Sequence, residues 1–260
     1  MESKIYRMRE FLNAADGHSL VLDVSAGLSL GPLPGLEDFP KALQPVLTLV
    51  DGLVASPGQT RRLVGRSRAE AALLVRADWT NALRGPDFVL PPETISHIPL
   101  LEPAEALDLG ASAAVLYFLL GYEEQIEAGC LRQTVQHALQ GGQAGLPLIL
   151  DVHPTGPRVV LPGKAVQLGV SYAFEGGADG VAIPWPGADA LEPVLVMAAG
   201  APVWIKPSSM DTALAEMEAA LELGATGLWL DERVFALPDP AAAVGLFAGR
   251  LHQAVIAGEV

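Results

Sequence analysis

Eight short, nearly continuous apolar runs recur along the chain, and segments with helical periodicity separate them. The runs are 19–25, 51–56, 71–77, 113–120, 146–153, 179–184, 202–206 and 226–231. Nearly continuous apolarity is typical of parallel strands covered on both faces, whereas strands with one wet face alternate. An intervening segment such as 211–225 begins with an acidic residue and ends beside a glycine, which favours an amphipathic helix. The pattern predicts eight strand-then-helix units.

Eight such units in one chain predict an α/β protein with a closed (β/α)8 barrel, built as a single domain over residues 1–260. A doubly wound open sheet is the alternative, but no Gly-rich dinucleotide fingerprint follows the first strand. The segment 79–101 is Pro-rich and interrupts the regular alternation of predicted strands and helices. A loop of this length is typical of an active-site lid or an interface arm, and the sequence leaves both open.

The charge balance narrows the classes of partner. Sixteen basic residues face thirty acidic ones, which gives a net charge of −14. Nucleic-acid grooves and anionic membrane surfaces need a basic face, so neither partner is expected. The amino terminus lacks the apolar core of a secretory signal, and a cytoplasmic location is expected. Cys130, the single cysteine, is predicted to be a packed, inert thiol on a helix, and His97 is predicted to be a surface histidine.

Several phrases resemble the archaeal-type class I fructose-bisphosphate aldolases and the related deoxyribose-phosphate and autoinducer-processing aldolases. They are GLSLGPLPGLEDFPKAL (27–43), DGLVASPGQTRRL (51–63), GASAAVLYFLLGYEEQ (110–125), LPLILDVHPTGP (146–157) and RVFALPDPAAAV (233–244). The resemblance covers nearly the whole chain. It implies a barrel with its chemistry at the carboxyl ends of the strands, and a homo-oligomer.

The catalytic positions of that family have changed here. The family's Schiff-base lysine ends its sixth strand, and the matching segment ADGVA (178–182) places Ala182 there. The family's first-strand aspartate matches Ser25, and its fifth-strand tyrosine matches His153. Because the sixth strand carries no lysine at this position, the resemblance implies either a catalytically silent protein or a reactive amine that has moved to another strand.

The family's phosphate-binding glycines and arginine have also changed. Pro207-Ser208 and Asp231-Glu232 stand at those positions. A phosphate site needs close backbone N–H groups and positive charge, whereas proline has no N–H and two carboxylates repel a dianion. A small non-phosphorylated carbonyl compound is the expected substrate.

Lys206 is the strongest remaining candidate for catalysis, since it ends the predicted seventh strand in VWIKPSS. An amine in an apolar barrel mouth loses its proton readily and attacks carbonyls. Asp151 and His153 alternate on one face of the fifth strand, where the histidine would move protons and the carboxylate would orient it. Asp23 should also face inward. The structural alternative pairs Lys206 with Asp151 or Asp231 as a buried ion pair.

The remaining predicted residues would bind substrate. They are Ser25, Arg76, Asp78, Trp185, Ser208 and Asp231. Arg76 would bind a substrate carboxylate or pair with an aspartate. A metal site at the neighbouring strand ends is a further alternative without any supporting spacing, and no cofactor is expected.

Two functions follow from these residues. The first is an aldolase-like carbon–carbon lyase, or a related carbonyl-processing enzyme, with Lys206 as the Schiff-base amine and His153, Asp151 and Asp23 assisting. The second is a catalytically silent homologue that binds a metabolite or serves as a structural subunit.

Overall fold

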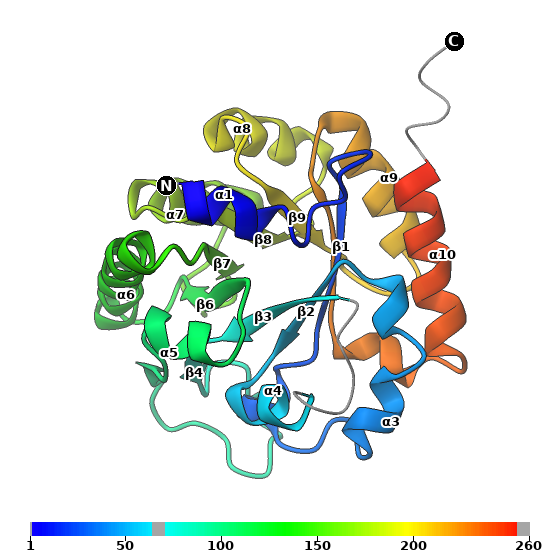
Figure 1. The fold of residues 1–260 in the computed structure, drawn as a ribbon. Helices are drawn as coiled ribbons and strands as arrows, with labels where there is room; N and C mark the ends of the chain where they lie inside the picture. Colours follow the sequence, from blue (N-terminus) through cyan, green and yellow to red (C-terminus); the bar gives the residue numbers. More distant parts are fainter. Residues whose placement is uncertain (1, 64–70, 254–260) are drawn as a thin grey trace.

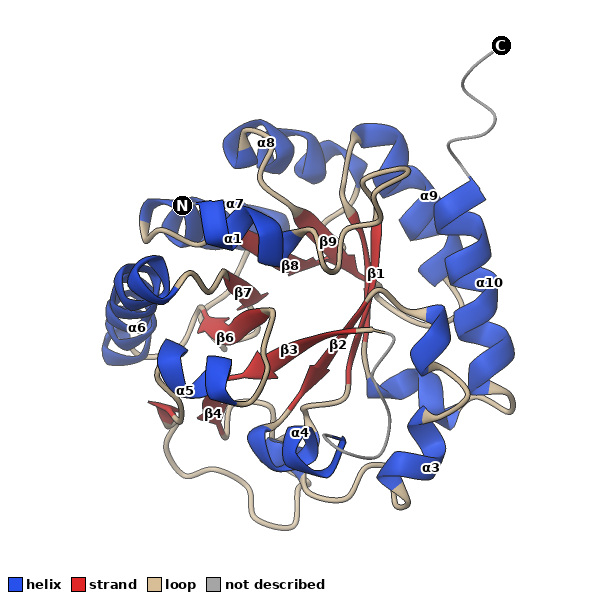
Figure 2. Cartoon of the chain, in the orientation of Figure 1, coloured by secondary structure: helices blue, strands red, loops and turns tan. Residues whose placement is uncertain are grey.

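The computed structural model describes residues 2–63 and 71–253 and contains one closed barrel of parallel strands (Figure 1, Figure 2). Its strands are β1 (Ser19–Asp23), β2 (Gly52–Ala55), β3 (Ala72–Arg76), β6 (Ala113–Leu119), β7 (Leu148–His153), β8 (Gly180–Pro184), β9 (Val203–Lys206) and β10 (Gly227–Leu230). Strands that follow one another in this list pair in parallel, and β10 returns to β1. The predicted (β/α)8 barrel is confirmed.

Helices surround the barrel, most of them outside its strands (Figure 2). They are α1 (Glu2–Met8), α2 (Gly27–Leu30), α3 (Phe39–Leu43), α4 (Pro57–Leu63), α5 (Pro103–Asp108), α6 (Glu124–Ala144), α7 (Pro162–Glu175), α8 (Ala188–Ala198), α9 (Ala213–Leu223) and α10 (Pro240–Gln253). Two 3-10 helices, η1 (Leu47–Leu49) and η2 (Glu232–Ala236), complete the set. No helix in the described part of the chain is long and apolar enough to cross a membrane.

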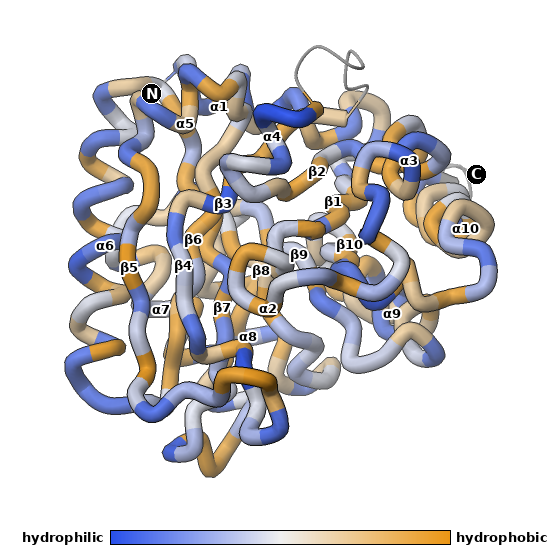
Figure 3. The backbone as a smooth tube through the Cα atoms, turned by 90° about the horizontal axis from the view of Figure 1, so that it is seen from below, coloured by the Kyte–Doolittle hydropathy of each residue, from blue (hydrophilic) through white to orange (hydrophobic). Residues whose placement is uncertain are grey.

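The burial of strands and helices follows the sequence pattern. All seven residues of β6 are buried, as expected for a strand between a helix layer and the barrel interior. Helix α6 is amphipathic instead: its buried face includes Cys130, Thr134, His137 and Gly141, at helical spacing. The alternation of hydrophilic and hydrophobic residues along α6 is visible in Figure 3. The helix ends at Gly145, whose φ of 73° is left-handed.

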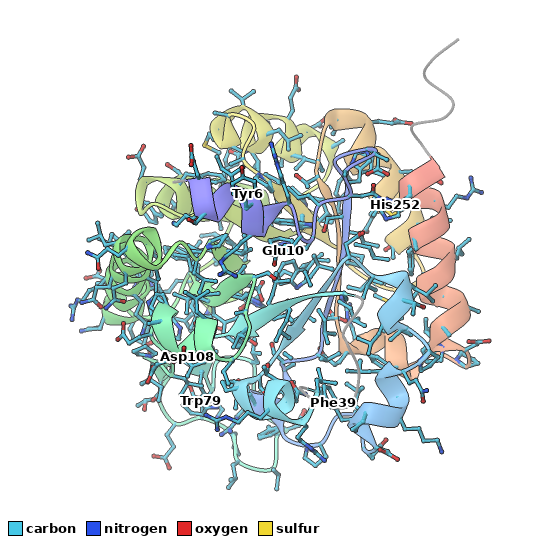
Figure 4. The ribbon with its side chains drawn as sticks, in the orientation of Figure 1. Tyr6, Glu10, Phe39, Trp79, Asp108 and His252 are labelled. Atoms are coloured by element: carbon cyan, nitrogen blue, oxygen red, sulfur yellow. The ribbon has the colours of Figure 1, made fainter. Side chains whose placement is uncertain are left out.

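The amino-terminal end of the barrel is closed by α1 and the residues that follow it. Phe11 stacks on Trp204 with ring centroids 5.8 Å apart, and Trp204 meets Trp229 at 6.0 Å. Tyr6 and Glu10, labelled in Figure 4, mark this segment. The three aromatic rings form an apolar floor, so the open space in the barrel lies toward the carboxyl ends of the strands.

The segment 79–101 is more ordered than its irregular sequence predicts. A short antiparallel ribbon pairs β4 (Asp78–Thr80) with β5 (His97–Pro99). The Trp79 indole donates to the Leu28 carbonyl at 3.1 Å, which ties the ribbon to α2. Leu83, in the same segment, lines the cavity at the carboxyl end of the barrel. The segment therefore forms part of the wall of that cavity.

Candidate active site

A cavity of about 410 Å³ opens at the carboxyl ends of the strands. Its lining includes the last residues of four strands, which are Asp23, His153, Pro184 and Lys206. Trp229 also lines the cavity, so the floor of aromatic rings lies beneath it. This is the end of a (β/α)8 barrel where catalytic residues lie in enzymes of this architecture.

Lys206 bonds to two side chains of β7 inside this cavity. Its Nζ donates to Asp151 Oδ1 and lies 3.0 Å from His153 Nε2. His153 Nε2 is also 3.0 Å from Asp151 Oδ1. The Lys206 side chain is 13% exposed and that of Asp151 only 4%. An amine, a carboxylate and an imidazole therefore meet at one point of the cavity wall, as the sequence predicted for these three residues.

Strand β8, the sixth strand of the barrel, carries small side chains at the point where the Lys206 side chain crosses it. Strand β8 lies between β7 and β9, so Lys206 must reach over β8 to meet Asp151. Ala182 pairs in register with Asp151 on one side and Trp204 on the other, and it is fully buried. Pro184, which pairs with Lys206, reaches the cavity lining. Because both side chains are short, they leave space for the lysine above them.

Arg76 connects the two inward-facing aspartates beneath the cavity. Its Nη2 donates to Asp23 Oδ2 at 2.6 Å and to Asp151 Oδ2 at 2.9 Å. Its Nε donates to Ser25 Oγ at 3.1 Å, and that hydroxyl donates to Asp23 Oδ1 at 2.6 Å. Arg76 is fully buried and does not line the cavity. The predicted pairing of Arg76 with an aspartate is present, whereas Ser25 and Arg76 are buried and do not line the cavity.

The charges around Asp151 and His153 set their protonation. Burial opposes ionisation of Asp151, but His153, Lys206 and Arg76 outweigh it and hold the pKa of this carboxyl well below its usual range. Burial lowers the pKa of His153, and the charge of Lys206 adds to the effect against the opposing carboxylate. At neutral pH these shifts favour an ionised Asp151 beside a neutral His153 imidazole.

Internal hydrogen bonds join the residues that follow β9 and β10 at the cavity. Arg233 follows Asp231 and lines the cavity, but its Nε donates to Asp231 at 2.8 Å. Its Nη1 and Nη2 donate to the carbonyls of Ser208 at 3.0 Å and Pro207 at 2.8 Å. The Ser208 N–H donates to Glu216 Oε2 at 2.8 Å. Each of the three guanidinium nitrogens of Arg233 and the backbone N–H of Ser208 thus has a protein partner. Arg233 is a residue that the sequence argument missed.

Glu232, which the sequence placed at a changed phosphate-binding position, also lines the cavity. Burial and the neighbouring Asp231 raise the pKa of Glu232 to about 7, against 4.5 for a free glutamate. An acid whose folded pKa exceeds its unfolded pKa binds its proton more tightly when folded. The free energy of unfolding therefore falls as pH rises from 4.5 to about 7, and the loss persists above that window.

Replacing Glu232 with glutamine should remove this penalty. We expect Glu232→Gln to raise the free energy of unfolding by about 1–2 kcal/mol at pH 8 and to leave it unchanged near pH 4. Urea unfolding at the two pH values measures the difference. Glu218→Gln, at a carboxylate whose side chain is 50% exposed, is the matched control. An equal effect of Glu232→Gln at both pH values would contradict the assignment.

Besides Ser25 and Arg76, two more of the predicted substrate-binding residues, Asp78 and Trp185, lie outside the cavity lining, and those predictions need correction. Asp78 is fully buried, and its Oδ2 lies 2.6 Å from His97 Nε2. His97 Nδ1 lies 3.2 Å from the Cys130 sulfur, so the predicted surface histidine is in fact a buried link between β5 and α6. Trp185 is half-buried against the outer core of the barrel. In contrast, Asp23, Ser208 and Asp231 line the cavity as expected.

The alternative of a metal site gains no support from the described residues. Within residues 2–63 and 71–253, no three His, Cys, Asp or Glu side chains are grouped so that they could hold a metal ion.

Comparisons with solved structures define the class of fold. A Schiff-base-forming fructose-1,6-bisphosphate aldolase shares it with a TM-score of 0.79, at 21% identity over 96% of this chain and 99% of the other. An archaeal fructose 1,6-bisphosphate aldolase matches with the same TM-score and coverage at 22% identity. The chain therefore has the barrel fold of these aldolases.

Comparisons with curated sequences point in the same direction. An uncharacterized aldolase of Saccharolobus solfataricus is 24% identical over 94% of this chain and 93% of its own length. A 2-amino-4,5-dihydroxy-6-oxo-7-(phosphonooxy)heptanoate synthase of Streptomyces griseus is 27% identical over 78% of this chain and 73% of its own. No protein-family model matches the chain. The sequence is similar to aldolases over most of its length.

Proposed function

We propose that this protein is an aldolase-type carbon–carbon lyase that forms a Schiff base between Lys206 and a small, non-phosphorylated carbonyl compound. The observation that carries the proposal is the contact of Lys206 Nζ with both Asp151 and the neutral His153 in the barrel mouth. The similarity to aldolases supports the reaction class.

The first steps make the imine. His153 Nε2 accepts a proton from the Lys206 ammonium, which frees the nitrogen lone pair while Asp151 stabilises the resulting imidazolium. Nζ attacks the substrate carbonyl carbon, and the C=O electron pair moves to oxygen. After proton transfer from nitrogen to that oxygen, His153 protonates the hydroxyl. Water leaves, and the nitrogen lone pair forms the protonated imine.

The next steps break the carbon–carbon bond. His153, neutral again, takes the proton of the β-hydroxyl. The O–H electrons become the new aldehyde C=O, and the electrons of the C–C bond move toward the iminium nitrogen to give an enamine. Protonation of the enamine carbon and addition of water release the second product and the free amine. One substrate thus yields two carbonyl products without an external oxidant or reductant.

The proposed absence of a phosphate group rests on the occupied donors of Ser208 and Arg233, on the missing N–H of Pro207, and on the carboxylates of Asp231 and Glu232. We therefore expect fructose 1,6-bisphosphate to bind no better than about 10 mM and not to be cleaved. Isothermal titration and a coupled assay measure the two quantities. Binding at or below about 1 mM would contradict the non-phosphorylated substrate class.

The proposed function is tested by borohydride trapping. The protein is incubated with dihydroxyacetone, hydroxyacetone, pyruvate or glyceraldehyde, reduced with sodium borohydride, and its intact mass is measured. We expect at least one compound to leave a single adduct, which peptide mapping places on Lys206. Absence of an adduct with every compound would overturn the lyase and favour the silent homologue.

A further inference from the structure

Tyr117 is a buried residue of the cavity wall with no part in the steps above. It lies on β6 and pairs in register with Asp151 on β7, so its side chain faces the barrel interior. Only 4% of the residue is exposed, yet it lines the same cavity as Lys206 and His153. Its position places a phenol beside the imidazole of His153, in the wall of the cavity that Lys206 also lines.

The aromatic ring of Tyr117 is held from two sides. The Arg76 guanidinium carbon lies 3.7 Å from the ring centroid, which is a close cation–π contact. The His153 ring meets it edge-on with centroids 5.2 Å apart. Because Arg76 is itself fixed by Asp23 and Asp151, the phenol is preorganised.

Within the described part of the chain the hydroxyl of Tyr117 makes no hydrogen bond, and it is not one of the fully buried polar atoms left without a partner, as fits an atom that borders the cavity. Tyrosine hydroxyls that are buried usually have a hydrogen-bond partner. Tyr122, buried on the following loop, lies 3.2 Å from Thr155 Oγ1 through its hydroxyl. Since Tyr117 borders the cavity, the partner that its hydroxyl lacks can come from a molecule bound there.

Burial keeps this phenol protonated. It raises the pKa of Tyr117 far above its usual value, with Asp23, Asp151 and Asp78 adding to the effect and Arg76 opposing it. A phenol that stays neutral over the working pH range is a hydrogen-bond donor rather than a base. It resembles in this respect the donors that stabilise developing oxyanions in enzymes.

We propose that Tyr117 is a catalytic residue whose hydroxyl donates a hydrogen bond to the substrate carbonyl oxygen while Lys206 Nζ attacks the carbonyl carbon. The proposal rests on the proposed lyase function. Tyr117 keeps its proton throughout: the C=O electron pair moves to oxygen, negative charge grows there, and the O–H dipole stabilises it. His153 carries out the proton transfers.

The test is the substitution Tyr117→Phe, which keeps the ring and its contact with Arg76 and removes only the hydroxyl. The rate of adduct formation is measured against the concentration of dihydroxyacetone, or of whichever carbonyl compound labels the parent protein. We expect the rate at saturation to fall about 10²- to 10³-fold. Because the hydroxyl makes no internal bond, the melting temperature should stay within about 2 °C of the parent. Tyr172→Phe, on α7 and 37% exposed, is the control and should leave the rate unchanged.

The outcomes separate this proposal from the lyase itself. Adduct formation by Tyr117→Phe at the parental rate would overturn the role of Tyr117 and leave the lyase standing. A slower variant whose melting temperature also falls by several degrees would show that the hydroxyl supports the fold, and would overturn the role as well. If the parent protein forms no adduct with any compound of the panel, both proposals fall together.

Discussion

Lys206→Met is expected to abolish borohydride trapping and turnover completely. Methionine keeps the length and apolar bulk of the side chain but removes the amine, so no carbinolamine can form. The decisive measurement is the intact mass after reduction, because it reports the imine itself and does not depend on the complete reaction. Lys164→Met is the matched control, since Lys164 Nζ binds Gln167 on the exposed side of α7. It should trap at the parental rate.

The same variant separates a catalytic lysine from a purely structural one. Removing one partner of a buried ion pair costs about 3–5 kcal/mol when the other charge is left alone. Asp151 is not left alone, because Arg76 Nη2 still donates to its Oδ2 at 2.9 Å. We therefore expect Lys206→Met to lose less than about 3 kcal/mol. A larger loss, together with a parent protein that forms no imine, would identify Lys206 as a structural cation in a silent barrel.

The sequence predicted the assembly of Lys206, Asp151 and His153 because two simple rules fix it. Side chains two residues apart on a strand share a face, and the carboxyl ends of parallel strands in a closed barrel converge. The eight apolar runs were long enough to fix the strand order, and the observed strands lie within them. The alternation of side chains along a strand shows which face of the sheet a residue lies on, but it does not show whether that residue reaches the cavity. Ser25 and Arg76 bond to each other at this end of the barrel, but neither lines the cavity.

The residues that the sequence placed wrongly or missed also have local explanations. The prediction for Asp78 extended the alternation of β3 past its end. The barrel strand stops at Arg76, and Asp78 belongs to the separate ribbon with β5, so its side chain points toward His97. Tyr117 was missed because it stands inside the apolar run AAVLYFLL, where an aromatic residue looks like core. Only the three-dimensional arrangement shows that its hydroxyl lacks a partner beside a cavity.

Arg76→Met is expected to be the most destabilising single substitution in the site. The guanidinium is fully buried and joins Asp23 and Asp151 across the barrel interior. Among the described residues, its removal leaves Asp23 with the hydroxyl and N–H of Ser25 as hydrogen-bond partners and takes one charge partner from Asp151. We expect the free energy of unfolding to fall by about 3–5 kcal/mol in urea denaturation at pH 7. Arg250→Met is the control, because Arg250 lies 3.9 Å from Glu218 with both side chains at least half exposed. It should change stability by less than about 1 kcal/mol.

The pH dependence of this loss tests its electrostatic origin. The folded pKa of Asp151 lies below its unfolded value, so its ionised form stabilises the protein above the unfolded pKa. That contribution is lost as pH falls through the folded pKa. Without Arg76 the Asp151 carboxylate should take up a proton at a higher pH, which removes its unfavourable buried charge. The stability difference between the parent and Arg76→Met should therefore shrink as pH falls from 7 toward 4. A difference that stays constant over this range would mean that Arg76 acts through packing against Tyr117 rather than through its charge.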